Sequence, residues 1–308
     1  MTFSDLKESA AGVLDDCLAL KRKERLLVVT DEYGYEVARA LWEAAKSRCK
    51  QPMMVMISPH RLSSDPLKNV KSWFSQFDAV ITTFKYPFKP IIESDYSTRL
   101  IQIKAPVAKR FHRLMNIDWK RHGSFTRKCA ALLSSSRTVQ VKCPNGSDIT
   151  FTNSKSSNKA NYGVITSPGA VGVLPAGCAE ITPQQETLQG TIVLDNFCGH
   201  FPLPQSDSFA LYVENGSIER VQSLSSTREI EIVFQKKRML KKVNCFGAGT
   251  HLTSGVKGCL NEHCIARGAV YFLFGERNGS DEVILPVVLK NASVWLDGRL
   301  WIDSGNYV

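Results

Sequence analysis

Residues 174–195 read LPAGCAEITPQQETLQGTIVLD, and our interpretation of the chain starts from this stretch. A turn containing Gly177 leads into a short polar segment, and Pro183 and Gly190 then precede the apolar run at 191–194. Proline and glycine mark turns, and a short apolar run bounded by turns is typical of a buried strand. We therefore expect strands separated by turns, in a layout typical of the wall of an active site.

The first third of the chain alternates between helical and strand patterns. Apolar residues recur at helical spacing over 5–20 and 36–49, and a short helical stretch surrounds 70–73. Short apolar runs that we interpret as strands lie at 25–30, 52–58, 78–83 and 99–104. Alternation of this kind predicts right-handed crossovers and a mostly parallel sheet covered by helices.

From about residue 135 onwards the pattern changes to paired strands. The segments 139–152 and 209–223 alternate apolar and polar residues around an Asn-Gly turn, which is a strong hairpin signal. Further strands are predicted at 229–234, 269–275 and 283–302. The predicted fold class is α/β: an N-terminal α/β domain with a mostly parallel sheet (1–130), followed by a β-rich α+β domain (131–308).

Composition restricts the class of protein and its compartment. The chain has 308 residues, and no apolar run approaches the roughly 20 residues that span a bilayer. Its first residues are partly acidic and lack the pattern of a signal peptide. It has nine cysteines, an odd number, and no Cys-x-x-Cys pair. This usage favours reduced thiols over a disulfide framework, so we expect a cytoplasmic protein that does not bind membranes.

The positive charge is concentrated in the first part of the chain. Residues 1–130 hold 23 Lys and Arg against 14 Asp and Glu, which is +9 of the total of +10. The segment 104–128 is the most basic part and includes Lys109, Arg110 and Arg113. It is either a solvated helix face or a patch for an acidic peptide or a nucleic acid. No nucleic-acid-binding signature accompanies it, so a nucleic acid is the less favoured partner.

Several short motifs occur in a characteristic order. They are VVTDEYGYEVARALWEAA (28–45), LPAG (174–177) with GTIVLD (190–195), FGAGTH (246–251), ARGAVYFLFG (266–275) and VWLDGRLWIDSG (294–305). In this order the chain resembles the metallo-aminopeptidase family typified by aminopeptidase T. Its relatives include the 2,5-dihydroxypyridine dioxygenases, iron enzymes built on the same frame. The resemblance covers nearly the full chain.

The resemblance implies a metal site that this chain has lost. Family peptidases hold two divalent ions with two Glu, two His and one Asp, and the ions activate a water for peptide hydrolysis. Carried over by motif, these positions are Cys178, Cys245, Tyr271, Ile284 and Pro286. Ile and Pro side chains cannot ligate a metal, and the same losses remove the iron ligands of a dioxygenase. We therefore expect no metal and no cofactor.

The cysteines leave alternatives open. The carry-over predicts that Cys178 and Cys245 face each other, and His251 and Cys264 lie nearby in the sequence with Cys259 and His263. Thiolate and imidazole suit zinc, so a replacement zinc site or a reactive thiol is conceivable. The spacings match no recognised zinc motif, and a free cysteine is commonly a small buried hydrophobe, so we favour packing. The pair Glu262-His263 is interpreted as a solvated surface pair.

The function expected from these observations is peptide binding without catalysis. In this interpretation the chain derives from a metallo-aminopeptidase and presents a precursor peptide to a tailoring enzyme, for example in the biosynthesis of a ribosomal peptide natural product. The peptide would be acidic and could add as a strand to an exposed sheet edge. The residues expected to bind it are Cys178, Glu180, Cys245, His251, Tyr271, Lys109, Arg110 and Arg113.

Two other function classes remain. One is an enzyme on the same frame with altered chemistry, a metal-dependent or cysteine-based peptidase or cyclase that uses Cys178, Cys245, Tyr271 and Glu180. The other is an oligomeric structural or regulatory protein without a small ligand, and a homodimer is the assembly that we expect. A metal analysis and a turnover assay distinguish the first class from a binding protein.

Overall fold

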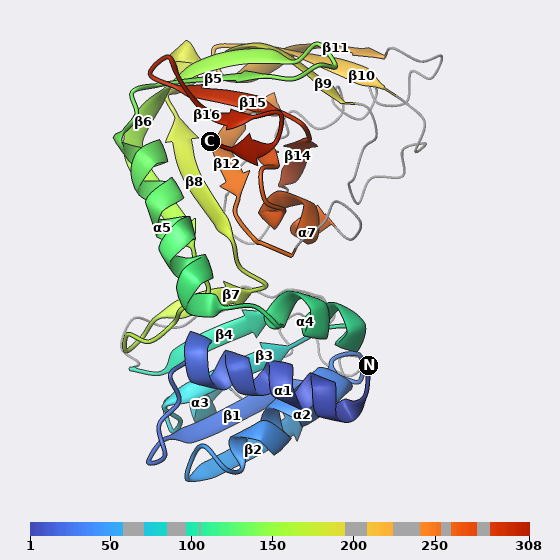
Figure 1. Cartoon of the computed structure of the whole chain (residues 1–308), viewed down its shortest axis with the longest axis vertical. Coiled ribbons are helices and arrows are strands. Elements are labelled where there is room, and N and C mark those ends of the chain that lie inside the picture. Colours follow the sequence, from blue (N-terminus) through green and yellow to red (C-terminus); the bar gives the residue numbers. More distant parts are fainter. Residues whose placement is uncertain are drawn as a thin grey trace. The chain divides into compact units, whose positions relative to one another are not determined.

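The chain forms two compact units, and each unit is built from two segments. A computed structural model describes residues 1–57, 71–84, 97–104, 106–194, 208–223, 241–253, 260–275 and 284–308. The first unit comprises Met1–Gly123 and Asn161–Ala176, and the second comprises Ser124–Ala160 and Gly177–Val308. Figure 1 shows the elements of both units, which are described separately below.

The first unit contains a five-stranded sheet in which every neighbouring pair is parallel. In sheet order its strands are β2 (Gln51–Met56), β1 (Arg25–Thr30), β3 (Ala79–Thr83), β4 (Arg99–Ile103) and β7 (Val171–Leu174). All residues of β3 and β4 are buried, as expected for a sheet that is covered on both faces. The predicted parallel sheet is confirmed.

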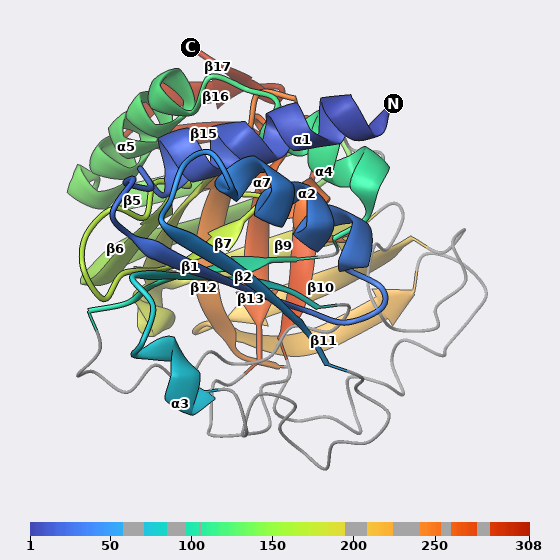
Figure 2. The ribbon, with the colours of Figure 1, turned by 90° about the horizontal axis from the view of Figure 1, so that it is seen from below.

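Helices cover both faces of this sheet. They are α1 (Phe3–Gly12), η1 (Val13–Cys17), α2 (Tyr35–Ala45), α3 (Lys71–Phe74) and α4 (Ala108–Met115). Thr2 and Asp5 form a capping box that starts α1, with each side chain bonded to the other residue's backbone amide. Residues of α1, α2 and α4 share one apolar core with β1, β3 and β4, whereas Phe74 of α3 packs in the core on the opposite face. Figure 2 shows α3 across β1 from α2.

The unit boundaries differ from the division at residue 130 that the sequence suggests. The first segment of the first unit ends at Gly123, inside α5 (Trp119–Ser135), and the segment 161–176 returns to that unit. The reason is β7, which pairs in parallel with β4 and so completes the first sheet. Its short sequence, VGVL, carries no signal of the sheet to which it belongs.

The second unit is β-rich, as predicted. Its strands are β5 (Thr138–Lys142), β6 (Asp148–Asn161), β8 (Cys178–Pro183), β9 (Gln189–Leu194), β10 (Phe209–Glu214), β11 (Ser217–Ser223), β12 (Val243–Gly249), β13 (Val270–Phe274), β14 (Leu285–Leu289), β15 (Ser293–Leu296), β16 (Arg299–Asp303) and β17 (Asn306–Tyr307). They join in the order β14-β13-β12-β8-β6-β5-β15-β16-β17, with β9, β10 and β11 branching from β6. Two further short elements are η3 (Gln185–Thr187) and α7 (Leu260–Ile265).

Both Asn-Gly hairpins are confirmed, as β5–β6 and β10–β11. In the second, Asn215 and Gly216 have φ of 48° and 73°, the left-handed conformation that this turn requires. The strand predicted at 229–234 lies outside the described residues. No helix within the described ranges is long and apolar enough to cross a membrane.

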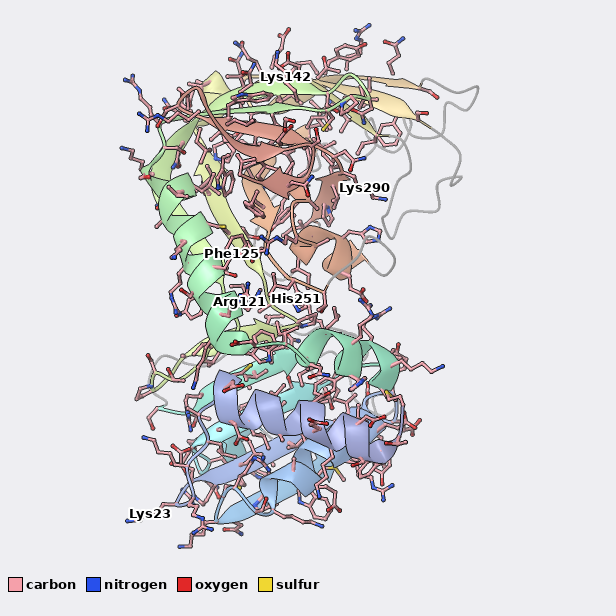
Figure 3. All side chains as sticks on the ribbon, viewed as in Figure 1. Lys23, Arg121, Phe125, Lys142, His251 and Lys290 are labelled. Atoms are coloured by element: carbon pink, nitrogen blue, oxygen red, sulfur yellow. The ribbon has the colours of Figure 1, made fainter. Side chains whose placement is uncertain are left out.

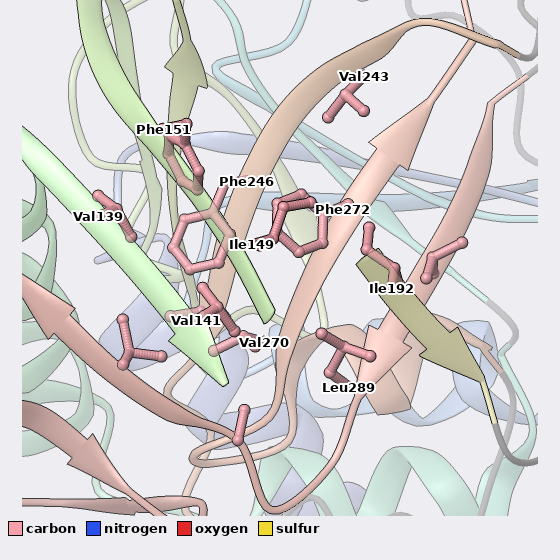
Figure 4. Packing of buried hydrophobic residues seen from close by; sticks show 14 of the residues in the cluster. Val139, Val141, Ile149, Phe151, Ile192, Val243, Phe246, Val270, Phe272 and Leu289 are labelled. Carbon is pink, nitrogen blue, oxygen red and sulfur yellow. The ribbon is translucent and has the colours of Figure 1, made fainter. Parts of the chain in front are cut away.

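Aromatic packing organises the core of the second unit. Phe246 of β12 contacts both Phe151 of β6 and Phe272 of β13, with ring centroids 5.2 Å apart in both pairs (Figure 4). These tilted contacts are the favourable geometry for aromatic rings. Because the three rings belong to three different strands, they fix the face of the sheet that is turned towards the core.

Candidate functional site

The face of β8, β12, β13 and β14 that points away from this core collects the residues predicted from the motifs. Along each strand, alternate residues belong to the core cluster, including Ile181, Phe246, Phe272 and Val287. Side chains alternate between faces along a strand, so the residues between them lie on the other face. We call this surface the site face; its members are Cys178, Glu180, Thr182, Cys245, Gly247, Tyr271, Leu273, Pro286 and Val288.

One row across the site face joins three strands. Glu180 of β8 is opposite Gly247 of β12, which is in turn opposite Tyr271 of β13. The Tyr271 hydroxyl donates a hydrogen bond of 2.7 Å to Glu180 Oε1. A Cβ at Gly247 would lie 2.5 Å from that hydroxyl oxygen, so only glycine leaves room for the tyrosine ring to reach over β12.

Tyr271 is held neutral in this row. Its side chain is 2% exposed, and burial raises the pKa of the phenol well above its usual value. The negative charges of Cys178, Glu180, Cys245 and Cys264, where ionised, raise the pKa further. The phenol therefore acts as a hydrogen-bond donor at all ordinary pH values.

The two thiols that we expected to face each other are separated along the sheet. Cys178 is opposite Gly249 of β12, whereas Cys245 lies four residues earlier on the same strand. At about 3.3 Å per residue this is a separation of roughly 13 Å, too far for a disulfide or a shared metal ion. The expectation that they face each other was wrong, because the strand register places them at different positions along β8 and β12, although both thiols lie on the site face. Cys178 is half-buried and Cys245 is buried, so Cys178 is the more accessible thiol.

The β14 side of the site face is apolar. Val288 is opposite Tyr271, and Pro286 is opposite Leu273. All three apolar side chains are half-buried, as is Ile284 just before the strand. Ile284 and Pro286 occupy the positions that the resemblance implies for a histidine and an aspartate, and neither can donate an electron pair to a metal.

Three further polar residues near this sheet are buried. His251, which is labelled in Figure 3, lies two residues beyond β12 and is 0% exposed. Its Nδ1 accepts a long hydrogen bond of 3.3 Å from the Thr253 amide. Its ring therefore presents no accessible surface to a peptide. Glu262 and His263 on α7 are 0% and 3% exposed, so their interpretation as a solvated pair was wrong. Packing of α7 against β12 and β14 covers them.

The predicted basic residues lie in the first unit, on α4. Lys109 and Arg113 are exposed and Arg110 is half-buried. The opposite side of the helix, with Phe111 and Leu114, is buried in the apolar core. The structure thus brings Cys178, Glu180, Cys245 and Tyr271 together on the site face and places the three basic residues on a different unit.

The donor set of the site face does not fit the metals that the family resemblance implies. Non-haem iron sites use two histidines and one carboxylate, and zinc sites use thiolate, imidazole or carboxylate at close range. At the positions that the resemblance implies for three of the ligands the chain has a tyrosine, an isoleucine and a proline, and the carboxylate of Glu180 accepts a hydrogen bond from that tyrosine. Among the described residues, no three His, Cys, Asp or Glu side chains are grouped so that they could hold a metal ion.

Sequence reasoning identified Glu180 and Tyr271 but missed the pairing between them. It also missed Gly247, whose lack of a side chain makes the pairing possible. The available signal was the glycine at the centre of FGAG, within an otherwise apolar strand, because such a glycine marks a close approach by another group. Leu273 and Val288 were missed because strand register determines their face, and register is not visible in the sequence.

Comparison with known proteins agrees with this frame. A family model for 2,5-dihydroxypyridine 5,6-dioxygenase (NicX) matches residues 68–231. That match includes β8, with Cys178 and Glu180, and ends before β12 and β13. Comparison with curated proteins found no match in sequence.

Two solved structures resemble the chain over its whole length. The 2,5-dihydroxypyridine dioxygenase of Pseudomonas putida KT2440 has a TM-score of 0.79 at 15% identity, over 100% of this chain and 98% of that one. The wild-type AmpT of Thermus thermophilus has a TM-score of 0.66 at 11% identity, over 99% of both chains. At these identities the likeness shows the fold, and the activity has to be argued from the site face.

Proposed function

We propose that this chain, which belongs to the 2,5-dihydroxypyridine 5,6-dioxygenase (NicX) family, binds a peptide at the site face and does not catalyse metal-dependent chemistry. In this proposal it descends from a metallo-aminopeptidase and presents a precursor peptide to a tailoring enzyme, for example in the biosynthesis of a ribosomal peptide natural product. The family fold is kept, and the residues that would perform metal chemistry are replaced.

The observation that carries the proposal is the bond between Tyr271 and Glu180 at 2.7 Å. A tyrosine that is buried, neutral and bonded to a carboxylate is unsuited to replace a histidine ligand, and it occupies one oxygen of the carboxylate. The pair is held in one orientation by its hydrogen bond and has apolar neighbours on one side, which suits recognition of a ligand. Metal-activated water, the nucleophile of the peptidase reaction, has no set of ligands among the described residues.

A peptide is favoured by the position of β14. Within the described residues β14 pairs with β13 alone and is the first strand of the sheet order. Its other edge carries backbone donors and acceptors, which an extended peptide can pair with as an added strand. Half-buried Pro286 and Val288 would then contact alternate side chains of that peptide.

The experiment is a metal and activity analysis of protein purified without chelators. We expect no stoichiometric iron, zinc, manganese or cobalt, and no turnover of aminoacyl reporters with added divalent metal or of 2,5-dihydroxypyridine with Fe(II) and oxygen. One or two ions per chain, or turnover of either substrate, contradicts the proposal.

A second candidate is an enzyme with thiol chemistry, because half-buried Cys178 lies close enough to Tyr271 to influence its pKa. A thiolate attacking a peptide carbonyl would break the C–N bond, release the amine after it takes up a proton, and form a thioester. Water or another amine would then cleave the thioester and restore the thiol. Turnover of a peptide that survives dialysis against chelator and disappears in Cys178→Ser would establish this candidate. Cys245→Ser is the matched control, because that thiol is buried.

A further inference from the structure

We propose that Glu180 binds an organic cation, an ammonium or guanidinium group of the ligand. The inference rests on the proposed function in taking the site face as the binding surface. It adds the chemical class of the group that is recognised there.

Glu180 carries a charge that no cationic side chain of the described residues offsets. Its carboxylate accepts one hydrogen bond, from Tyr271, and no Lys or Arg in the described ranges forms an ion pair with it. Glu24, which is also half-buried, is by contrast paired with Arg99 at 2.7 Å. Because Glu180 is only half-buried, its carboxylate can be reached by a cation from outside the protein.

The hydrogen-bond partner of Glu180, Tyr271, does not neutralise the carboxylate. Tyr271 donates a hydrogen bond but is neutral, because burial keeps the pKa of its phenol above the usual value. The bond therefore fixes the orientation of the carboxylate and leaves its negative charge in place. A carboxylate has about four acceptor positions, so Oε2 and the second lone pair of Oε1 remain for a ligand.

The orientation of Glu180 depends on residues of three neighbouring strands. Tyr271 reaches Glu180 only because the intervening residue is glycine, and an added Cβ there would lie 2.5 Å from the hydroxyl oxygen. Three strands thus contribute one residue each to orient a single carboxylate. The half-buried neighbours of Glu180 on the same face of β8 are Cys178 and Thr182, and neither is a lysine or arginine that would repel a cation.

The ligand that fits is one with an ammonium or guanidinium group, because these donate charge-assisted hydrogen bonds to a carboxylate. A peptide that is acidic overall still meets this requirement through a lysine or arginine side chain or its amino terminus. The proposal therefore agrees with the expected acidic peptide and specifies which of its groups reaches the site face.

The test is an NMR titration with probes that share a butyl chain and differ in the charge of the group at its end. Butylammonium and butylguanidinium are compared with butanol at millimolar concentration, and the backbone amides of residues 179–181, 247 and 271 report binding. We expect both cations to shift these amides saturably and butanol to leave them in place. In Glu180→Gln the cation affinity should fall at least tenfold, whereas Tyr271→Phe, which keeps the carboxylate, should lose no more than a few-fold.

A purely structural role predicts a different result. A glutamine side chain at position 180 still accepts the phenol hydrogen bond, so a structural role leaves the response to the cations unchanged in Glu180→Gln. That result, an equal response to butanol, or the absence of any shift with the cations would overturn the proposal. Titrating an uncharged, amino-terminally acetylated peptide separates this inference from the proposed function. If that peptide binds and the cations do not, peptide binding stands and recognition of a cation fails.

Discussion

The two faces of the ladder β8–β12–β13 have the same backbone and opposite chemistry. On the core face, Ile181, Phe246 and Phe272 are 0–1% exposed and pack in one aromatic and aliphatic cluster. On the site face, Glu180, Gly247 and Tyr271 form a polar row. Residues on the core face specify the frame, and those on the site face are free to change without altering it. This explains how one fold accompanies identities as low as 11% and 15%.

The largest effect expected from this contrast is on stability. Phe272→Ala removes a ring of β13 that packs against Phe151 and Phe246, and it should lower the free energy of unfolding by about 3–5 kcal/mol. The matched variant is the adjacent Leu273→Ala, on the site face and half-buried, for which we expect about 1 kcal/mol. Urea denaturation measures both, and equal losses would show that the two faces do not differ in packing.

A smaller loss is expected for Gly247→Ala. The added methyl group occupies the space of the Tyr271 ring, and overpacking of this kind costs about 1–3 kcal/mol. In a Tyr271→Ala background the clash is absent, so the same substitution should then cost little; the double-mutant cycle measures the difference. Gly12→Ala in α1 is the control, because its Cβ meets nothing within 4 Å and alanine favours a helix. A loss that persists without the tyrosine ring would contradict the role assigned to Gly247.

Tyr271→Phe tests the hydrogen bond without changing the packing. Loss of a donor to a carboxylate should lower the free energy of unfolding by about 1–2 kcal/mol at neutral pH. The raised pKa of Tyr271 means that the folded state keeps this proton after the unfolded chain has lost it. Its contribution is therefore complete below the unfolded pKa of about 10 and is lost as the pH rises further.

The wild type should consequently lose stability more steeply than Tyr271→Phe above pH 10. Tyr307, whose pKa is also raised by burial, contributes equally in both proteins and cancels in the comparison. Chemical denaturation at a series of pH values up to 11 measures the two slopes. Parallel slopes would show that the phenol of Tyr271 is not held neutral.

The smallest effect on stability is expected on α4, where the same contrast between faces recurs. Reversing Lys109, Arg110 and Arg113 to Glu leaves the buried Phe111 and Leu114 in place and should change the free energy of unfolding by less than about 1 kcal/mol. If the segment binds an acidic peptide, affinity should fall about tenfold and become less dependent on salt. Calorimetry with an acidic peptide decides this, and unchanged affinity would identify the basic residues as a solvated face.

Much of the frame could be predicted from the sequence, because it depends on local patterns. Helical spacing, short apolar runs and two Asn-Gly turns identify the parallel unit and the β5–β6 and β10–β11 hairpins. These signals are set by the period of the secondary structure and by residues that tolerate a left-handed backbone. The motif order also singled out Cys178, Cys245 and Tyr271, which the structure places on one face of the sheet.

The site itself could be predicted only in part, because its contacts depend on register and burial. A four-residue offset along β12 separates two cysteines that motif positions alone would bring together. The burial of Glu262 and His263 depends on where α7 packs, and a six-residue helix with two charged residues gives no sign of it. Long-range register follows from the three-dimensional packing of strands, which one sequence does not reveal.

The return of the chain to place β7 beside β4 has a consequence for synthesis on the ribosome. The parallel sheet cannot be completed until residues 171–174 have emerged, and by then β5 and the whole of β6 are already outside. The usual order, in which an N-terminal domain finishes folding before the next begins, is therefore unavailable to this chain. Until β7 arrives, β4 has an unpaired edge that can bind other strands. A chain shortened to its first 130 residues would keep that edge open permanently and should aggregate.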